Sequence, residues 1–457
     1  MRRPRRIWRD NFEAMTLALV VAVLLKYFAV EAYKIPTGSM QPTLMGWSDG
    51  RGGGLFDRVL VDKFSFHARD PERFEVVVFQ FPLDRSKHFV KRLVGMPGDH
   101  LRIAGGDLWL ELPGEDGEPE WCIVRRPQGV QESHWFGIKT EDRWNLGSQP
   151  GRWTAMGTGL HASDEASAVF PGDEPGVRDN AEHGYPQSIL NAMGRPKRAG
   201  GQNDVGDLRL SAMLRAGDGC TEIRLEIKEG NQAYTAALPG PAAPEGARIE
   251  IRNSTGTHAT MDRPLSLSSS APTRVRFWNL DDRVELEWDG EVLLQMDIEP
   301  ARRGNTGVAL ATFGGGARFD DLVLERDIFY DADSGPVDSW RVPEDHYVVL
   351  GDNSVDSADS RAWQRTTVHS MEGEFEGSIS GQRRPDQNPA NLIESEHHDD
   401  VAFRDEWGER RVFRSTRVHA SNSSAPFVPR HLMRGRAVCV FWPWNPIKGI
   451  SRPSWVR

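Results

Sequence analysis

Three observations predict a mainly β protein behind one N-terminal helix, with a second β domain inserted into the chain. Residues 14–30 form a single apolar stretch after an arginine-rich start. Residues 55–103 contain short segments rich in Val, Phe and Leu, separated by Pro and Gly. Residues 204–328 contain further alternating segments at close, regular spacing, which is typical of a jelly-roll β-sandwich.

The composition supports a folded protein of more than one domain. The chain has 457 residues, of which 38% are hydrophobic and 27% are charged, so two or three domains with their own cores are expected. Its net charge of −10 argues against nucleic acid as the main partner. Cys122, Cys220 and Cys439 lie far apart without metal-ligand spacing, so neither a disulfide framework nor a metal site is predicted.

The N-terminus has the pattern of a membrane anchor. "MRRPRRIWRD" carries five arginines against one aspartate, and residues 14–30 are apolar except for Thr16 and Lys26. A helix of this length rises roughly 25 Å, the short end of what spans a bilayer. Basic residues before such a helix keep the N-terminus in the cytoplasm and place the rest on the exported side. The alternative is a cleaved signal peptide, but "VEAYKIPTGSM" after the apolar stretch contains no A-x-A-like site.

The pattern of strands and loops divides the chain into six parts. The stretch from about 130 to 200 reads as loop, with "PGDEPG" and "GRPKRAGGQND" as connectors. The expected parts are the basic terminus and anchor (1–32), the first part of a catalytic domain (33–135), an insertion holding the sandwich (136–335, core about 204–328), the second part of the catalytic domain (336–363), a polar surface insertion (364–428), and the last strand with the C-terminus (429–457).

Four segments carry the chemistry, and their order is informative. They are "IPTGSMQPTL", "DRVLVDKF", "HFVKRLVGMPGD" and "GDNSVDSADSR". In this order, behind an anchor, they resemble the motifs of type I signal peptidase, a membrane-bound serine protease that removes signal peptides from exported proteins. The chain departs from that pattern in its two insertions, which fall in loops between the motifs, where added length costs little.

Ser39 and Lys91 are the candidate catalytic pair. A serine hydroxyl needs a base to become a good nucleophile, and no histidine accompanies Ser39 in a convincing motif. A lysine can serve if burial lowers its pKa. Lys91 lies in an apolar strand, and the resemblance implies that it is the general base; Lys63 reads as a strand-surface lysine. Because side chains alternate along a strand, Arg92 is expected to face the other way, toward solvent or a carboxylate.

The resemblance also implies an oxyanion hole. Its donors are the backbone N–H of Ser39 and the hydroxyl of Thr37, where relatives often have serine. Gly38 between them permits an unusual backbone conformation, and Pro36 and Pro42 stiffen the turn.

The "GDNSVDSADSR" segment has a supporting role in the same resemblance. Ser357 is implied to orient the lysine, Asp359 and Arg361 to form a salt bridge, and the remaining cleft loop to comprise Gly351, Asp352 and Asn353. Taken alone, the segment reads equally well as a polar turn with helix-capping residues. The shallow apolar pocket for small substrate side chains is expected to involve Ile35, Pro36, Met40, Leu44 and Val90, although each reads nearly as well as ordinary core.

The function expected from this resemblance is removal of signal peptides by a Ser/Lys endopeptidase through an acyl-enzyme. No cofactor or metal is implied. The expected location is a bacterial cytoplasmic membrane, crossed once, with the catalytic domain on the exported side. Expected partners are signal peptides and the lipid bilayer, with a glycan or envelope ligand considered for the sandwich. Two alternatives stay open: a membrane-tethered glycan-binding scaffold on a degenerate peptidase frame, and a self-cleaving Ser/Lys regulator, which is normally soluble.

Overall fold

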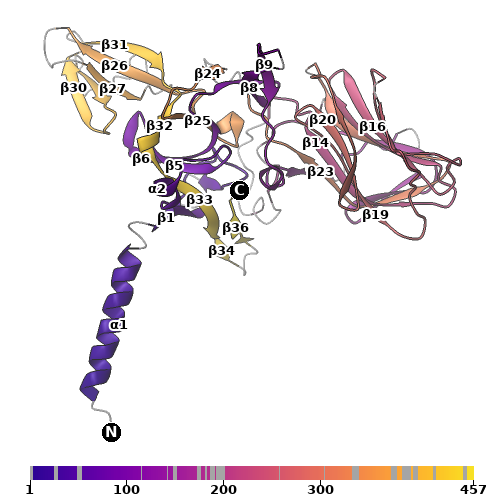
Figure 1. The fold of residues 1–457 in the computed structure, drawn as a ribbon, viewed down its shortest axis with the longest axis horizontal. Helices are drawn as coiled ribbons and strands as arrows, with labels where there is room; N and C mark the ends of the chain where they lie inside the picture. The colour runs from indigo at the N-terminus through magenta and orange to yellow at the C-terminus, as the bar shows by residue number, and fades with distance from the viewer. Residues whose placement is uncertain are drawn as a thin grey trace.

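The structure is a computed structural model of the chain, and it is mainly β (Figure 1). The residues that it describes are 4–24, 29–48, 54–114, 116–140, 143–147, 152–171, 176–180, 183–185, 191, 201–256, 258–302, 304–331, 339–371, 378–382, 393–394, 400–414, 418–445 and 450–456.

The N-terminal helix α1 (Pro4–Leu24) extends away from the β domains (Figure 1). Its apolar side chains are exposed, with Leu17 at 66% and Leu19 at 64%. Within the described ranges, no helix meets the combined length and hydropathy expected of a membrane span. Residues 25–28 of the predicted anchor lie outside these ranges, and Val30 already begins strand β1. The predicted apolar segment 14–30 is therefore not one helix throughout.

A central sheet joins the first and last parts of the chain, in the strand order β1-β4-β33-β5-β6-β25-β32, with β36 also pairing with β33. Its apolar faces form because the strands are rich in Val and Phe that alternate inward. The strands are β1 (Val30–Lys34), β4 (Arg58–Asp62), β5 (Val76–Phe81), β6 (Asp84–Gly95), β25 (His346–Leu350), β32 (Val428–Pro429), β33 (Met433–Trp442) and β36 (Ser454–Trp455).

Short elements surround this sheet and complete its core. A smaller sheet, β24-β7-β8-β9, packs against β25 through residues such as Leu101, Trp340 and Val348. The elements are β2 (Gly46–Ser48), β3 (Gly54–Phe56), α2 (Ser65–Ala68), β7 (His100–Ala104), β8 (Asp107–Pro113), β9 (Pro119–Ile123), α3 (Gln128–Gln131), β24 (Ser339–Arg341), the 3₁₀ helices η4 (Ser354–Asp356) and η6 (Arg430–Leu432), β34 (Trp444–Asn445) and β35 (Ile450–Ser451). We call the central sheet with these elements the catalytic domain.

The inserted sandwich has two antiparallel sheets packed around one large apolar core (Figure 1). The orders are β11-β12-β23-β14-β19-β20-β21, with β10 also pairing with β23, and β13-β22-β15-β16-β17-β18. The strands are β10 (Phe136–Ile138), β11 (Trp153–Met156), β12 (Gly159–Ala162), β13 (Ala166–Phe170), β14 (Leu208–Ala216), β15 (Glu222–Glu229), β16 (Gln232–Pro239), β17 (Glu250–Asn253), β18 (His258–Thr260), β19 (Thr273–Leu280), β20 (Arg283–Trp288), β21 (Glu291–Asp297), β22 (Thr306–Phe313) and β23 (Ala317–Arg326).

The structure differs from the sequence-based expectation in two segments. Strands β10 to β13 lie in the stretch that reads as loop, and they extend the sandwich beyond the expected core of 204–328. The polar stretch 364–428 contains paired strands that lie apart from the sandwich (Figure 1): β26 (Gln364–Ser370), β27 (Ser378–Gln382), β28 (Ile393–Glu394), β29 (Asp400–Arg404), β30 (Arg410–Arg414) and β31 (Val418–Ser424). In both segments the strands are short or polar, so pairing with neighbouring strands decides their structure rather than local pattern.

Candidate active site

Ser39 lies in a tight turn that directly follows β1. The turn is closed by two backbone hydrogen bonds, from the Gln41 N–H to the Gly38 carbonyl (3.0 Å) and from the Leu44 N–H to the Met40 carbonyl (2.8 Å). The side chains of Met40 and Leu44 are buried in the apolar core beneath the turn. Because these two anchors face inward, Ser39 is held half-buried at the surface of the catalytic domain.

Lys91 reaches Ser39 from strand β6. Its Nζ donates a hydrogen bond to Ser39 Oγ over 2.5 Å. The lysine is only 3% exposed, and this burial lowers its pKa to about 8, although the carboxylates of Asp359 and Asp352 oppose the shift. Desolvation disfavours the ammonium form, so a neutral amine becomes accessible near neutral pH. An amine of this kind beside a hydroxyl can act as its general base.

Arg92 points away from Lys91 and binds a carboxylate. Its guanidinium donates from Nε to Asp352 Oδ1 (2.8 Å) and from Nη2 to Asp352 Oδ2 (2.7 Å), and both side chains are fully buried. Burial opposes ionisation of Asp352, but the guanidinium outweighs it and lowers the pKa of this carboxyl. The Thr43 hydroxyl also donates to Asp352 Oδ2 (2.6 Å). One carboxylate therefore connects strand β6 to the turn that carries Ser39.

The loop after β25 holds the other side of the Ser39 turn. The Asn353 backbone N–H donates to the Ser39 carbonyl (3.2 Å), and its side-chain Nδ2 donates to the Gly38 carbonyl (3.0 Å). Gly351 fits where a larger residue cannot: an added Cβ would lie 2.4 Å from the Ser39 carbonyl oxygen and 2.2 Å from Ser357 Oγ. Glycine is therefore required at position 351, because the Ser39 turn and the Ser357 side chain leave no room for a Cβ atom.

A buried ion pair shapes the same loop from behind. Arg361 donates from Nη2 to Asp359 Oδ2 (2.7 Å), and the Gly351 N–H donates to the same oxygen (2.9 Å). Arg361 also donates from Nη1 to Ser354 Oγ (2.6 Å). Ser357 behaves differently from its implied role: its hydroxyl is buried without a hydrogen-bond partner among the described residues. The hydrogen bond to Lys91 that the resemblance implies is therefore not formed.

A cavity of about 610 Å³ opens beside Ser39 and Lys91. Of the predicted pocket residues, Leu44 does not line it, because its side chain is fully buried in the core under the turn. Thr37 and Ser357 also face the cavity, as do Tyr33 and His88, which the sequence did not single out. The predicted pocket residues that do line it are Ile35, Pro36, Met40 and Val90.

Sequence reasoning placed Arg92 correctly on the opposite face but did not identify what it binds. Asp352 lies 260 positions further along the chain, so local pattern carries no signal for this pairing. Thr43 and Ser354 were not singled out either, because a lone hydroxyl residue in a polar turn is ordinary. The one signal in the sequence was the position of Arg92 directly after the candidate lysine in an apolar strand, because a charged side chain that is buried needs a partner of opposite charge.

The geometry defines a class of site: a serine hydroxyl held against a buried lysine amine, at the edge of a cavity on a β domain. Residues 8–118 and 294–378 match the family model described as signal peptidase, peptidase S26. The first matched segment contains Ser39 and Lys91, and the second contains the loop of Gly351 and Asp359.

Curated relatives point to the same family. The chain is 35% identical over 113 residues to probable signal peptidase I-2 of Synechocystis sp., covering 23% of this chain and 47% of that protein. It is 38% identical over 109 residues to signal peptidase I of Pseudomonas fluorescens (21% and 35%), and 31% identical over 134 residues to probable signal peptidase I-1 of Synechocystis sp. (27% and 61%). The chain thus spans about a third to three fifths of these relatives. Two segments of the chain are thus similar to signal peptidases of peptidase family S26, and most of the β-sandwich lies between them.

Two solved structures have low overall similarity to the chain. A carbohydrate-binding module from Bacillus subtilis has a TM-score of 0.26 at 10% identity, covering 40% of this chain and 95% of that one. Galectin LEC-6 from Caenorhabditis elegans has a TM-score of 0.21 at 8% identity, covering 27% and 82%. Scores this low carry no argument about a ligand, and the glycan partner considered for the sandwich stays a prediction.

Replacing Gly351 with alanine should disturb the Ser39 turn, because the new Cβ would overlap the Ser39 carbonyl and Ser357 Oγ. We expect Gly351→Ala to destabilise the fold by about 1–3 kcal/mol, as overpacking does, measured by urea unfolding. Gly129→Ala is the matched control, since an added Cβ there meets nothing within 4 Å. Equal stability of the two variants would contradict the close packing described.

Removing the guanidinium of Arg92 should leave Asp352 buried and unpaired. We expect Arg92→Met to cost about 3–5 kcal/mol in free energy of unfolding, measured by denaturant titration. In the control Lys63→Met, loss of the partly exposed ion pair with Glu31 (3.4 Å) should cost at most about 1 kcal/mol. A loss for Arg92→Met as small as that of the control would show that the buried pair contributes little.

Proposed function

We propose that this chain is a membrane-anchored serine endopeptidase that removes signal peptides from exported preproteins, with Ser39 as nucleophile and Lys91 as general base. The observation that carries the proposal is the 2.5 Å contact between Lys91 Nζ and Ser39 Oγ, made by an amine that is almost completely buried. The similarity of the two matched segments to signal peptidases supports the substrate class.

The proposed mechanism uses only side chains of this chain. Neutral Lys91 accepts the hydroxyl proton of Ser39 as its Oγ attacks the scissile carbonyl, which forms a tetrahedral oxyanion. Collapse of this intermediate breaks the peptide C–N bond, and the lysine ammonium gives its proton to the leaving amine. The same lysine then takes a proton from water as the water oxygen attacks the ester carbonyl. The ester C–O bond breaks, and the lysine ammonium returns the proton to Ser39 Oγ as the acid product leaves.

The oxyanion is proposed to accept hydrogen bonds from the Ser39 backbone N–H and the Thr37 hydroxyl. Both residues line the cavity, and Thr37 is exposed there, free to turn toward a bound substrate. Ser357, whose buried hydroxyl has no partner among the described residues, is proposed to bind Lys91 after a change of side-chain rotamer. Asp359 and Arg361 hold the loop that positions it.

The residues around Ser39 and Lys91 suit the proposed substrate, and the N-terminal helix suits a membrane location. Ile35, Met40 and Val90 give the cavity apolar walls, which suit the small side chains that signal peptides present before the cleavage site. We propose that α1 and the apolar residues after it anchor the chain in the cytoplasmic membrane of a bacterium, with the arginine-rich end inside. The exposed apolar side chains of α1 are consistent with a lipid environment.

Cleavage of a signal-peptide substrate by the purified chain in detergent tests the pair directly. Lys91→Ala should lower kcat/KM by about 10²–10⁴-fold because the proton acceptor is lost, and Ser39→Ala should abolish acyl-enzyme formation. Lys63→Ala, which removes a lysine that does not line the cavity, should cleave normally. Full activity of folded Ser39→Ala would reject Ser39 as the nucleophile, whereas absence of cleavage by the folded wild type would favour the scaffold alternative.

The kcat/KM for cleavage should also increase with pH. Only neutral Lys91 accepts a proton, and its pKa is lowered to about 8. Below that value the neutral fraction falls about tenfold per pH unit, so kcat/KM should rise with pH and level off above about 8. A rate that stays constant from pH 5 to 9 would contradict lysine as the base.

A further inference from the structure

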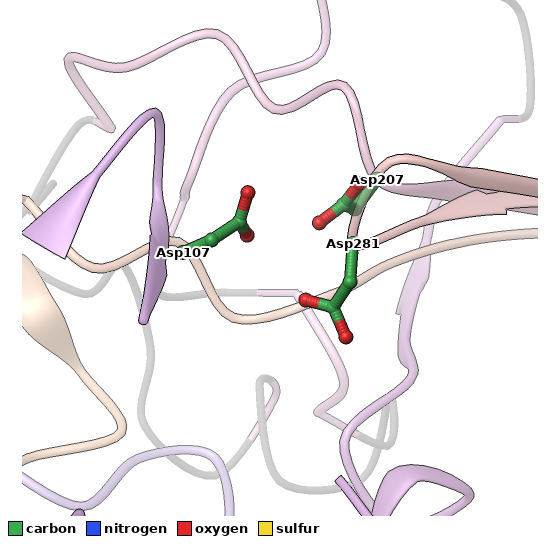
Figure 2. A group of neighbouring side chains, drawn as sticks. All are labelled: Asp107, Asp207 and Asp281. Carbon is green, nitrogen blue, oxygen red and sulfur yellow. The ribbon is translucent and has the colours of Figure 1, made fainter. Parts of the chain in front are cut away.

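Three aspartates from distant parts of the sequence meet where the sandwich adjoins the catalytic domain (Figure 2). Asp107 begins strand β8 of the catalytic domain, Asp207 precedes β14, and Asp281 lies in the turn between β19 and β20 of the sandwich. One carboxylate oxygen from each lies within 4.8 Å of the others. Figure 2 shows the carboxylates of Asp107 and Asp207 pointing toward each other, with an oxygen of Asp281 beside them.

Within the described part of the chain, no lysine or arginine forms an ion pair with any of the three carboxylates. The neighbouring cations are engaged elsewhere: Arg126 donates to Asp327 Oδ2 (2.5 Å), and Arg125 pairs with Asp297 (3.5 Å). Arg125 does contact Asp281, but through the backbone carbonyl (2.9 Å). The three side chains therefore carry mutual repulsion that no direct protein partner balances.

A second observation indicates a ligand at the three carboxylates: a buried acceptor oxygen lacks a hydrogen-bond partner within the described ranges. Asp281 is 3% exposed, and its Oδ2 is buried without a hydrogen-bond partner among the residues described. Two residues earlier, Asn279 Oδ1 is another buried acceptor without a partner in the described part of the chain, while its Nδ2 donates to Glu229 Oε2 (2.9 Å) and, over 3.4 Å, to the carbonyl of Gly206, directly before Asp207. Buried acceptors of this kind are normally satisfied. The unpartnered oxygen of Asp281 belongs to one of the three carboxylates that meet here.

The electrostatics agree with this geometry. Burial raises the pKa of Asp107 and Asp207 well above the usual range, and the neighbouring carboxylates raise both further. Burial also raises the pKa of Asp281 to about 6. Carboxylates so placed must bind either protons or a cation to be tolerated.

We propose that Asp107, Asp207 and Asp281 form a Ca²⁺ site that joins the inserted sandwich to the catalytic domain. Hard oxygen ligands suit Ca²⁺, which binds them at about 2.3–2.6 Å, so that oxygens on opposite sides lie up to roughly 5 Å apart. Mg²⁺ binds at about 2.0–2.1 Å and would accept only about 4.2 Å across. Mutual distances within 4.8 Å fall inside the range that Ca²⁺ accepts. The proposal departs from the sequence-based expectation that the chain holds no metal.

The backbone around the site is held in place on both sides. The Tyr330 N–H donates to the Gly106 carbonyl (2.9 Å), and the Asp327 N–H donates to the Asp207 carbonyl (3.0 Å). None of the three aspartates lines the Ser39 cavity. The ion would set how the sandwich sits beside the catalytic domain, and it would take no part in peptide cleavage.

Calcium titration of the full chain in detergent tests the site. Thermal unfolding of the wild type should shift upward by roughly 5–10 °C at a hundredfold excess of Ca²⁺ over its Kd. Hydrogen exchange should slow at the same time in the β7–β8 hairpin and in the β19–β20 turn. Asp207→Asn and Asp281→Asn should lose both responses. Asp207→Asn is the safer variant for folding because Asp207 is less buried.

Asp289→Asn is the matched control for these variants. Asp289 occupies the neighbouring β20–β21 turn with a positive φ of 50°, and its Oδ1 accepts only a local hydrogen bond from the Arg274 N–H (2.9 Å). It should respond to Ca²⁺ like the wild type. Absence of a wild-type response at matched ionic strength, or an undiminished response of Asp207→Asn and Asp281→Asn, would overturn the proposal in favour of shared protons. An equal response to Mg²⁺ would overturn the choice of Ca²⁺.

Discussion

The candidate site depends on one condition: the amine of Lys91 is kept away from water while it contacts the hydroxyl of Ser39. An exposed lysine at neutral pH is an ammonium and cannot accept a proton. Burial lowers the pKa of Lys91, and the carboxylates of Asp359 and Asp352 oppose this shift. Both carboxylates are themselves paired with buried arginines, Asp352 with Arg92 and Asp359 with Arg361. The proposed role of Lys91 as a base therefore depends on the charges around it as well as on its burial.

The same pairs assemble the site mechanically. Asp352 contacts both strand β6 and the Ser39 turn through Arg92 and Thr43, while Asn353 contacts the turn from the next position. Segments separated by more than 250 positions along the chain are thus brought within hydrogen-bonding distance. The Arg92–Asp352 contact is buried and the contacts of Thr43 and Asn353 are partly buried, so water screens them less than contacts at the surface. A small error in the packing of this loop would be transmitted to the nucleophile.

The large insertion is compatible with this arrangement because it leaves and re-enters the catalytic domain in the smaller sheet, between β9 and β24. The central strands that carry the site stay paired with one another. The sandwich has an apolar core of its own, so it does not compete for the core of the catalytic domain. A cation at Asp107, Asp207 and Asp281 would add a link between domains at a place where carboxylates otherwise repel each other.

The sequence by itself determined the mainly β class and the regular strands of the sandwich, because alternation is a local property of the chain. Its ordered motifs also directed attention to Ser39 and Lys91, which we propose as the catalytic pair. It did not reveal β10 to β13, whose short segments become strands only by pairing with the rest of the sandwich. It also placed Leu44 in the pocket, where the structure places it in the core. The partner of Arg92, the unpaired hydroxyl of Ser357 and the meeting of three aspartates were decided by tertiary structure alone, since each depends on residues far apart in sequence whose proximity no local pattern encodes.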